Sequence, residues 1–184
     1  MKANTIIGAD QGKRRGADFY PTPPDVTIAL LDFLQVPKGA MIWEPACGDG
    51  DMARVFSDQG YGVISTDIRL GVDFLTADMP ECVDWIITNP PFSIADEFIE
   101  RCTDHRKPFA LLLKSQYWHA AKRRNLFLRY PPTYILPLTW RPDFTGQGAS
   151  LMDVCWCVWD YKGLSYSLYK PLKRPKGEQS GSKQ

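Results

Sequence analysis

A short apolar run that leads through a glycine-containing loop into a helical segment is the feature that most constrains the fold of this chain. Residues 41–43 (Met-Ile-Trp) form the apolar run, residues 44–50 (Glu-Pro-Ala-Cys-Gly-Asp-Gly) form the loop, and the helical segment ends near Gly60. Two more apolar runs follow, at residues 62–66 and 84–88, and each leads directly to a polar residue. The pattern predicts parallel strands joined by helices, with polar side chains at the carboxyl ends of the strands.

The alternation of strand and helix patterns continues along the chain. Further helix patterns lie at residues 25–34, 94–102 and 118–128, and further strand patterns at residues 109–113 and 134–136. Asp25 is expected to cap the first of these helices. Strands separated by helix-length segments imply right-handed crossovers, so the sequence predicts a doubly wound α/β fold with a mostly parallel sheet. Residues 154–159 and 165–169, separated by a short turn at Lys162-Gly163, are expected to form an antiparallel pair at the sheet edge, with Trp156 and Trp159 in the core or on the edge strand.

The length of 184 residues indicates one domain, which we expect to span residues 19–172. Residues 1–18 and 173–184 lack apolar periodicity and are expected to be mobile ends. No apolar run approaches the roughly 18 residues that cross a bilayer, which favours a cytoplasmic protein without a membrane partner. The five cysteines lack paired CxxC spacing, so free thiols and no metal site are expected. The sequence does not indicate an oligomeric state.

A net charge of +1 excludes a strong long-range attraction for polyanions. Any surface for nucleic acid must therefore be local. Basic clusters occur at residues 13–15, at residues 122–124, and at Lys170, Lys173, Arg174 and Lys176. Each cluster is compatible with phosphate contacts, and equally with a solvated helix face or a charged chain end.

The loop at residues 44–50 is suited to close contact with a ligand that is not rich in phosphate. Gly48 and Gly50 permit a tight turn, but Glu44 and two neighbouring aspartates would repel a pyrophosphate, and the loop lacks the GxGxxG pattern of dinucleotide sites. A cofactor with a positive centre and a ribose agrees better with these residues, because Glu44 is anionic and Asp67 can accept two ribose hydroxyl hydrogen bonds. S-adenosylmethionine has this chemistry. A purely structural turn is the alternative.

Asp73 and Phe74 follow soon after Asp67 and are candidates for the adenine end of such a cofactor. Asp73 would accept a hydrogen bond from the adenine amino group, and Phe74 or Ile68 would cover the ring. The alternative is an acidic loop followed by a core aromatic residue.

The tetrapeptide Asn89-Pro90-Pro91-Phe92 directly follows the run at residues 84–88 and is the candidate catalytic site. Its two prolines fix the backbone and remove two amide donors. At the carboxyl end of a strand, the Asn89 side chain and the Pro90 carbonyl can accept hydrogen bonds from both N–H groups of an amine, and this makes the nitrogen lone pair available. Methyl transfer would then require chiefly positioning and electrostatic stabilisation. Phe92 would stack on a planar substrate.

These residues resemble those of the S-adenosylmethionine-dependent amino-methyltransferases, above all the small, phage-type DNA N6-adenine methyltransferases, whose hallmark is D/N/S-P-P-Y/F/W. The resemblance spans roughly residues 20–159 and implies a Rossmann-like class I methyltransferase fold. It also implies that Glu44, Ala46, Gly48, Gly50, Asp67, Ile68, Asp73, Phe74 and Asn89 contact the cofactor. The segment Phe19-Tyr20-Pro21-Thr22-Pro23 resembles the one that closes over the methionine moiety, which adds Tyr20, Pro21 and Thr22 to the cofactor set.

The order of the two motifs resembles the gamma arrangement, in which target recognition follows the catalytic motif. That region is very short here, which argues against sequence-specific recognition of a duplex by a separate domain. Residues 139–150 contain Trp140, Arg141 and Phe144 and are expected to hold a flipped base. The alternative is an ordinary connection between strands.

The expected function is transfer of a methyl group to the exocyclic N6 amino group of adenine in DNA, in the host cell cytoplasm if the protein is phage-encoded. The same tetrapeptide also serves RNA adenine, cytosine N4 and protein glutamine N5 methylation. A non-catalytic nucleic-acid-binding module on the same fold is a second alternative, and a nicotinamide oxidoreductase is a third that the missing GxGxxG pattern disfavours.

Overall fold

The computed structural model describes residues 20–146, 152–161 and 166–176. The expected N-terminal segment at residues 1–18 and most of the expected tail lie outside the described residues, as does the turn at Lys162-Gly163. Seven strands form one sheet in the order β2-β1-β3-β4-β6-β5-β7. Their bounds are β1 Met41–Glu44, β2 Gly62–Ser65, β3 Trp85–Thr88, β4 Phe109–Lys114, β5 Tyr134–Pro137, β6 Val154–Trp159 and β7 Leu168–Tyr169.

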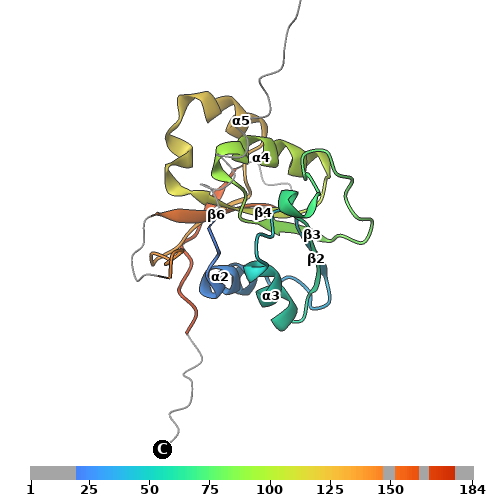
Figure 1. Cartoon of the computed structure of the whole chain (residues 1–184). Helices are drawn as coiled ribbons and strands as arrows, with labels where there is room; N and C mark the ends of the chain where they lie inside the picture. Colours follow the sequence, from blue (N-terminus) through green and yellow to red (C-terminus); the bar gives the residue numbers. More distant parts are fainter. Residues whose placement is uncertain (1–19, 147–151, 162–165, 177–184) are drawn as a thin grey trace, which may run out of the picture.

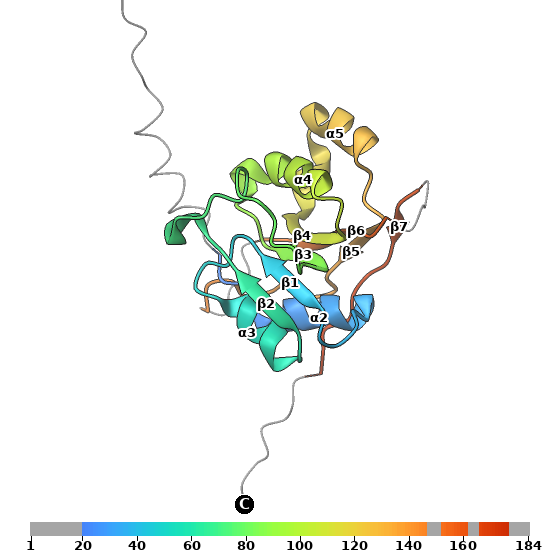
Figure 2. The same ribbon diagram turned by 90° about the vertical axis from the view of Figure 1, so that its right-hand side faces the viewer.

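Helices cover both faces of this sheet. Helices α2 (Pro24–Leu34) and α3 (Asp51–Asp58) lie on one face, and α4 (Ala95–Asp104) and α5 (Arg124–Arg129) lie on the other (Figures 1 and 2). Strands β1, β2, β3 and β4 pair in parallel. The doubly wound, mostly parallel fold predicted from the sequence is therefore confirmed.

Alternating side chains of the strands feed two separate hydrophobic cores, one on each face of the sheet. In β4, Ala110 and Leu112 belong to the core beneath α2 and α3, whereas Phe109, Leu111 and Leu113 belong to the core beneath α4. This two-residue alternation is the periodicity of a strand that is buried on both faces. It explains why the strand sequences are continuous apolar runs rather than alternating ones.

Among the strands of the described residues, β6 alone is reversed, and its position differs from the prediction. It pairs antiparallel with β4 on one side and with β5 on the other, so it lies inside the sheet, whereas β7 pairs in parallel with β5 at the edge. The reason is burial: all six residues of β6 are buried, including Trp156 and Trp159, and an edge position would expose one row of its backbone groups. The core assignment of these two tryptophans is confirmed.

Two helix predictions are corrected. Asp25 does not cap α2, because Pro23 is the N-cap and Pro24 occupies the first turn; instead the Asp25 carboxylate accepts a hydrogen bond from Arg174 at 2.8 Å. The expected helix at 118–128 is two 3₁₀ turns, Ser115–His119 and Ala121–Arg123, followed by α5. Ala120 is extended between the two turns and interrupts the helix.

Three loops that follow parallel strands meet at the carboxyl edge of the sheet. Glu44 ends β1, Asp67 follows β2 and Asn89 follows β3. Because β1 lies between β2 and β3, the polar ends of these strands are neighbours. Within the described residues, no helix is long and apolar enough to cross a bilayer.

Candidate active site

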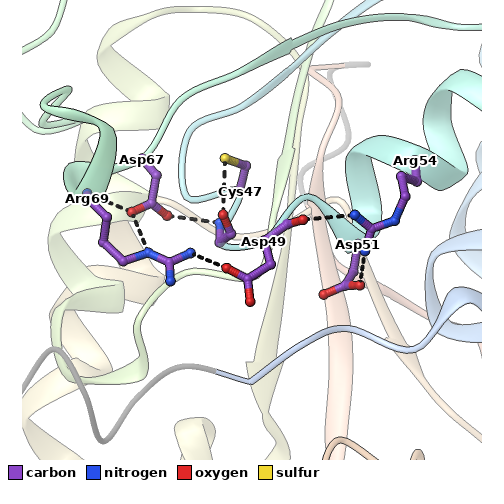
Figure 3. Close-up of polar contacts among 7 residues, drawn as sticks. Cys47, Asp49, Asp51, Arg54, Asp67 and Arg69 are labelled. Atoms are coloured by element: carbon purple, nitrogen blue, oxygen red, sulfur yellow. Dashed lines mark hydrogen bonds and ion pairs between the residues drawn. The ribbon is translucent and has the colours of Figure 1, made fainter.

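The loop after β1 is attached to the end of β2 by backbone and side-chain hydrogen bonds. The Cys47 amide donates to the Thr66 carbonyl at 3.0 Å, and the Gly48 amide donates to Oδ2 of Asp67 at 2.9 Å (Figure 3 shows Asp67 beside this loop). Gly48 and Gly50 have φ angles of 57° and 83°, in the left-handed region that favours glycine. Glycine at both positions therefore helps to turn the chain into α3.

Asp67 is held by Arg69 as well as by the loop. Its Oδ1 accepts hydrogen bonds from the Arg69 amide at 2.8 Å and from Arg69 Nε at 3.3 Å, while the other end of the same guanidinium binds Asp49 at 3.1 Å. Arg69 thus bridges the loops that follow β1 and β2 (Figure 3). Neither Arg69 nor its bridging position was predicted, because a lone arginine in a loop carries no sequence signal.

A cavity of about 670 Å³ opens between these loops, and we call it the first cavity. Eleven of the twelve predicted cofactor residues line it: Tyr20, Pro21, Thr22, Glu44, Ala46, Gly48, Asp67, Ile68, Asp73, Phe74 and Asn89. Gly50 does not, because its contribution is the turn itself: its amide donates to the Cys47 carbonyl at 2.8 Å. The volume lies in the range of about 300–1,000 Å³ that is usual for small-molecule sites.

Other lining residues were not among the predicted cofactor contacts. They are Pro45, Cys47, Asp51, Met52, Arg69, Val72, Leu75, Ser93, Ile94 and Phe98, together with Pro91 of the tetrapeptide. Met52 and Phe98 reach the cavity from α3 and α4, and their helical spacing identifies them only as core residues. Cys47 has a buried thiol whose pKa is raised by that burial and by the nearby Glu44 carboxyl, so it lines the cavity as a neutral group.

Glu44 is a buried acid in the wall of the first cavity. Its side chain is only 2% exposed, and within the described residues its Oε2 has no hydrogen-bond partner. Burial raises the pKa of Glu44 to about 8, and the neighbouring Asp51 and Asp67 add to the increase. A bound positive charge would strongly stabilise the ionised form of an acid with these surroundings.

An aromatic wall closes the part of the first cavity near Asp73. Phe74 is 3% exposed and packs against Trp43 and Phe98, with ring centroids 5.1 and 4.7 Å apart. Oδ1 of the neighbouring Asp73 accepts a hydrogen bond from the Leu75 amide at 3.0 Å, which fixes its orientation. Phe74 is therefore both a core residue and a lining residue of the first cavity, so its two sequence interpretations are compatible.

Asn89 is oriented by the chain segment that precedes α2. Its Nδ2 donates to the Tyr20 carbonyl at 3.2 Å and to the Thr22 hydroxyl at 3.1 Å. A carbonyl can only accept a hydrogen bond, so the amide nitrogen must face Tyr20 and the amide oxygen must face away from it. Within the described residues, Oδ1 of Asn89 is buried and has no hydrogen-bond partner. The Asn89 Oδ1 atom can therefore accept a hydrogen bond from a ligand.

The rest of the tetrapeptide lines two cavities, Pro91 the first and Phe92 a smaller one. Pro90 is buried, and Phe92 is 9% exposed, packs against Tyr20 at a centroid distance of 5.8 Å, and lines the smaller cavity. Lys114, at the end of β4, places its ammonium 4.5 Å from the Phe92 ring centroid. One part of the Phe92 ring surface is therefore already covered by a cation.

The predicted substrate residues after β5 do not line either cavity. Phe144 is 5% exposed and meets the Tyr20 ring edge to face at 6.3 Å, so it supports Tyr20 from the core side. Trp140 is partly buried against the same core, and the exposed Arg141 pairs with Asp153 at 2.8 Å. Residues 147–150 of this loop lie outside the described residues.

Comparison with solved structures defines the class of fold. A protein described as the modification subunit of a type I restriction enzyme from Vibrio vulnificus matches 92% of this chain and 49% of its own, with a TM-score of 0.61 and 14% identity. A protein of Listeria monocytogenes described as a class I S-adenosylmethionine-dependent methyltransferase matches 82% of this chain and 65% of its own, with a TM-score of 0.57 and 15% identity. The chain therefore has the class I S-adenosylmethionine-dependent methyltransferase fold.

Sequence comparison gives a more particular relationship. No family model matches the chain. Over 91 residues the chain is 31% identical to the type II methyltransferase M.TthHB8I of Thermus thermophilus. The match covers 41% of this chain and 21% of that protein. The chain spans about a fifth of the length of this relative and less than two thirds of the two solved structures. The expected likeness to S-adenosylmethionine-dependent methyltransferases is confirmed, and these neighbours agree with the expected cofactor.

Proposed function

We propose that this chain is an S-adenosylmethionine-dependent methyltransferase that acts on the N6 amino group of adenine in DNA. The observation that carries the proposal is the orientation of Asn89, whose Nδ2 is bound by Tyr20 and Thr22 while its buried Oδ1 has no partner among the described residues. An acceptor of this kind, beside a cavity of cofactor size, suits the N–H group of an incoming amine. Leaving it unpaired costs about 1–3 kcal/mol, which a bound amine would recover.

The residues of the first cavity suit S-adenosylmethionine. Glu44 supplies a buried carboxyl for a positive charge, Asp67 supplies carboxylate oxygens for ribose hydroxyls, and Phe74 supplies an apolar surface for the adenine. Oδ2 of Asp67 accepts one hydrogen bond from Gly48 and keeps a second acceptor position, whereas both positions of Oδ1 are engaged by Arg69. A ribose that binds both oxygens therefore displaces the Arg69 guanidinium from Oδ1.

When bound, the cofactor would supply an electrophilic methyl group on sulfur. Asn89 would accept one N–H of the target amine through Oδ1, the Pro90 carbonyl would accept the other, and the nitrogen lone pair would face the methyl group. The carbon–nitrogen bond would form as the carbon–sulfur bond of the cofactor breaks, and the surplus proton would leave the nitrogen for solvent. The contribution of the chain is thus orientation and stabilisation of developing charge, without a covalent intermediate.

The choice of DNA adenine is supported by relatives and by the motif resemblance. The matched relatives are described as a type II methyltransferase and a type I modification subunit. The Asn-Pro-Pro-Phe tetrapeptide resembles that of DNA N6-adenine methyltransferases. With DNA as the substrate, the enzyme would act in the cytoplasm, or in the host cytoplasm if it is phage-encoded.

The test is methyl transfer with labelled S-adenosylmethionine to DNA, RNA and protein in parallel, followed by digestion and mass analysis of the product. N6-methyladenine in DNA is expected, with Asn89→Ala as the inactive control. Label only in RNA adenine, in cytosine N4 or in protein glutamine would replace the proposed substrate by that alternative. Cofactor binding without transfer to any of them would support the non-catalytic binding module.

A further inference from the structure

The smaller cavity, of about 340 Å³, adjoins the catalytic tetrapeptide at Phe92. We call it the second cavity, and its walls are Phe92, Ser93, Lys114, Gln116, Tyr117 and Arg123. Ser93 lines both cavities, so the two are neighbours across residues 91–93. A substrate that places an amine at Asn89 can therefore extend into the second cavity.

The walls of the second cavity carry a net positive charge. Arg123 is neutralised by Asp96, which accepts a hydrogen bond from its Nε at 2.9 Å. Within the part of the chain that the structure describes, Lys114 has no ion pair with a carboxylate, and its contacts are with the faces of Phe92 and Tyr20, at 4.5 and 5.9 Å from the ring centroids. The Lys114 ammonium is therefore a cation held beside the catalytic aromatic residue without an anionic partner.

Tyr117 and Arg123 in the wall of the second cavity are held by Asp96 and by each other. Tyr117 is 3% exposed and donates its hydroxyl hydrogen bond to Asp96, and the Arg123 guanidinium lies 3.8 Å from the centre of the Tyr117 ring. Lys114 itself ends β4 and pairs with Val154 of β6. The walls of the second cavity thus include a strand end and a buried tyrosine.

We propose that the second cavity binds the phosphate next to the target nucleotide, with Lys114 as its charge partner. This inference rests on the proposed function and deepens it, because it assigns a binding site for the backbone of the nucleic acid. The Lys114 ammonium and the Gln116 amide supply several hydrogen-bond donors, and a phosphodiester offers acceptors in several directions. A protein glutamine carries no such anion, so the second cavity favours a nucleic acid over a protein substrate.

The test uses unmethylated DNA and RNA oligonucleotides of one sequence that the enzyme methylates. In these oligonucleotides, single phosphodiesters near the target are replaced by neutral methylphosphonates. Wild-type kcat/KM should fall about tenfold at one position. Lys114→Met keeps the apolar contact with Phe92 and removes the charge. Its kcat/KM on the normal substrate should fall by a similar factor, and the methylphosphonate at that same position should lower it no further. The control is Lys107→Met, which changes a lysine just before β4, at the end of the strand opposite to Lys114. This variant should retain the full methylphosphonate effect.

Two outcomes overturn the inference: a wild-type enzyme that is insensitive at every position, or losses from Lys114→Met and methylphosphonate that multiply at all positions. Oligonucleotide binding measured by fluorescence anisotropy separates this failure from failure of the proposed function. Absence of methyl transfer together with binding that depends on Lys114 contradicts only the proposed function, and methylation of RNA alone leaves the phosphate site standing. Label in protein alone, with no oligonucleotide bound, contradicts both.

Discussion

The Thr22 hydroxyl lies 3.1 Å from Nδ2 of Asn89, although the two residues are 67 positions apart in the sequence. This hydrogen bond joins the segment before α2 to the end of β3 and, together with the Tyr20 carbonyl, determines which end of the Asn89 amide faces away from that segment. The segment before α2 therefore has two roles: it lines the first cavity, and it orients the candidate catalytic residue.

Thr22→Val should lower the rate of methyl transfer while leaving cofactor affinity nearly unchanged. The variant keeps the shape of the buried side chain but removes the acceptor for Asn89, so the amide loses one of its two anchors. The loss of one hydrogen bond of about 1–1.5 kcal/mol corresponds to a five- to tenfold lower kcat. Thr22→Ser retains the hydroxyl and should recover most of the rate. Equal losses for both variants would argue against an orienting role.

Asn89→Ala should lower kcat by about 100-fold or more, because it removes an acceptor that acts on charge developing in the transition state. The cofactor Kd should change only a few-fold, since the carboxylates and the aromatic wall remain in place. Single-turnover kinetics and calorimetry measure the two quantities separately. A large rise in cofactor Kd with little loss of kcat would contradict the assigned role.

Asp67→Ala should weaken cofactor binding more than it lowers kcat, and by at least about tenfold, because a buried charge-assisted partner of the ribose is lost. Arg69→Ala is the matched variant, since it removes only the exposed arm of the same network. An ion pair of this exposure contributes about 0–1 kcal/mol, so the Kd of this variant should stay within about fivefold of wild type. A stronger effect of Arg69→Ala than of Asp67→Ala would mean that Arg69, and not Asp67, binds the cofactor.

Glu44 should make cofactor binding depend on pH. Burial raises the pKa of its carboxyl to about 8 in the free protein, whereas a cationic ligand binds best when the carboxyl is ionised. The cofactor affinity should therefore rise with pH, by at most about tenfold per unit, and level off above pH 8. Glu44→Gln should abolish this dependence. Calorimetric titrations from pH 6 to 9 measure it, and a flat wild-type profile would contradict it.

The same acid should affect folding stability in the opposite direction. Its pKa is about 8 in the folded chain and 4.5 in a free side chain, so the folded state binds the extra proton between these values. The stability that Glu44 contributes is fully present below pH 4.5 and is lost as the pH rises through 8. The melting temperature of the cofactor-free protein should fall over this range relative to that of Glu44→Gln. A constant difference between the two proteins would count against the buried, protonated acid.

Trp156 should be among the most costly core residues to replace. It is fully buried in β6, and its indole N–H donates to the Val26 carbonyl of α2 at 3.0 Å. Trp156→Ala should lower the free energy of unfolding by about 3–5 kcal/mol in denaturant titrations. Tyr169→Ala, at an exposed position in β7, is the control and should change it by about 0.5 kcal/mol or less. Comparable effects of the two variants would contradict the interior position of β6.

Much of the fold could be predicted because the relevant signals are local. The apolar run of β1, the glycines that turn the chain at residues 48 and 50, and the polar residues that end β2 and β3 each act within a few positions. The place of β6 could not be predicted in this way. Its continuous apolar sequence is compatible with any fully buried strand, and only the available edges of β4 and β5 select its position.

The sequence by itself determined the order of the motifs and the class of fold. Of the twelve residues that it predicted to contact the cofactor, eleven line the first cavity. The tertiary structure alone decided the orientation of the Asn89 amide, the bridge through Arg69, and the position of Lys114 beside Phe92. The physical reason is that chain geometry and burial preferences are written in neighbouring residues. Hydrogen bonds and charges between distant segments depend on which strands become neighbours when the sheet assembles.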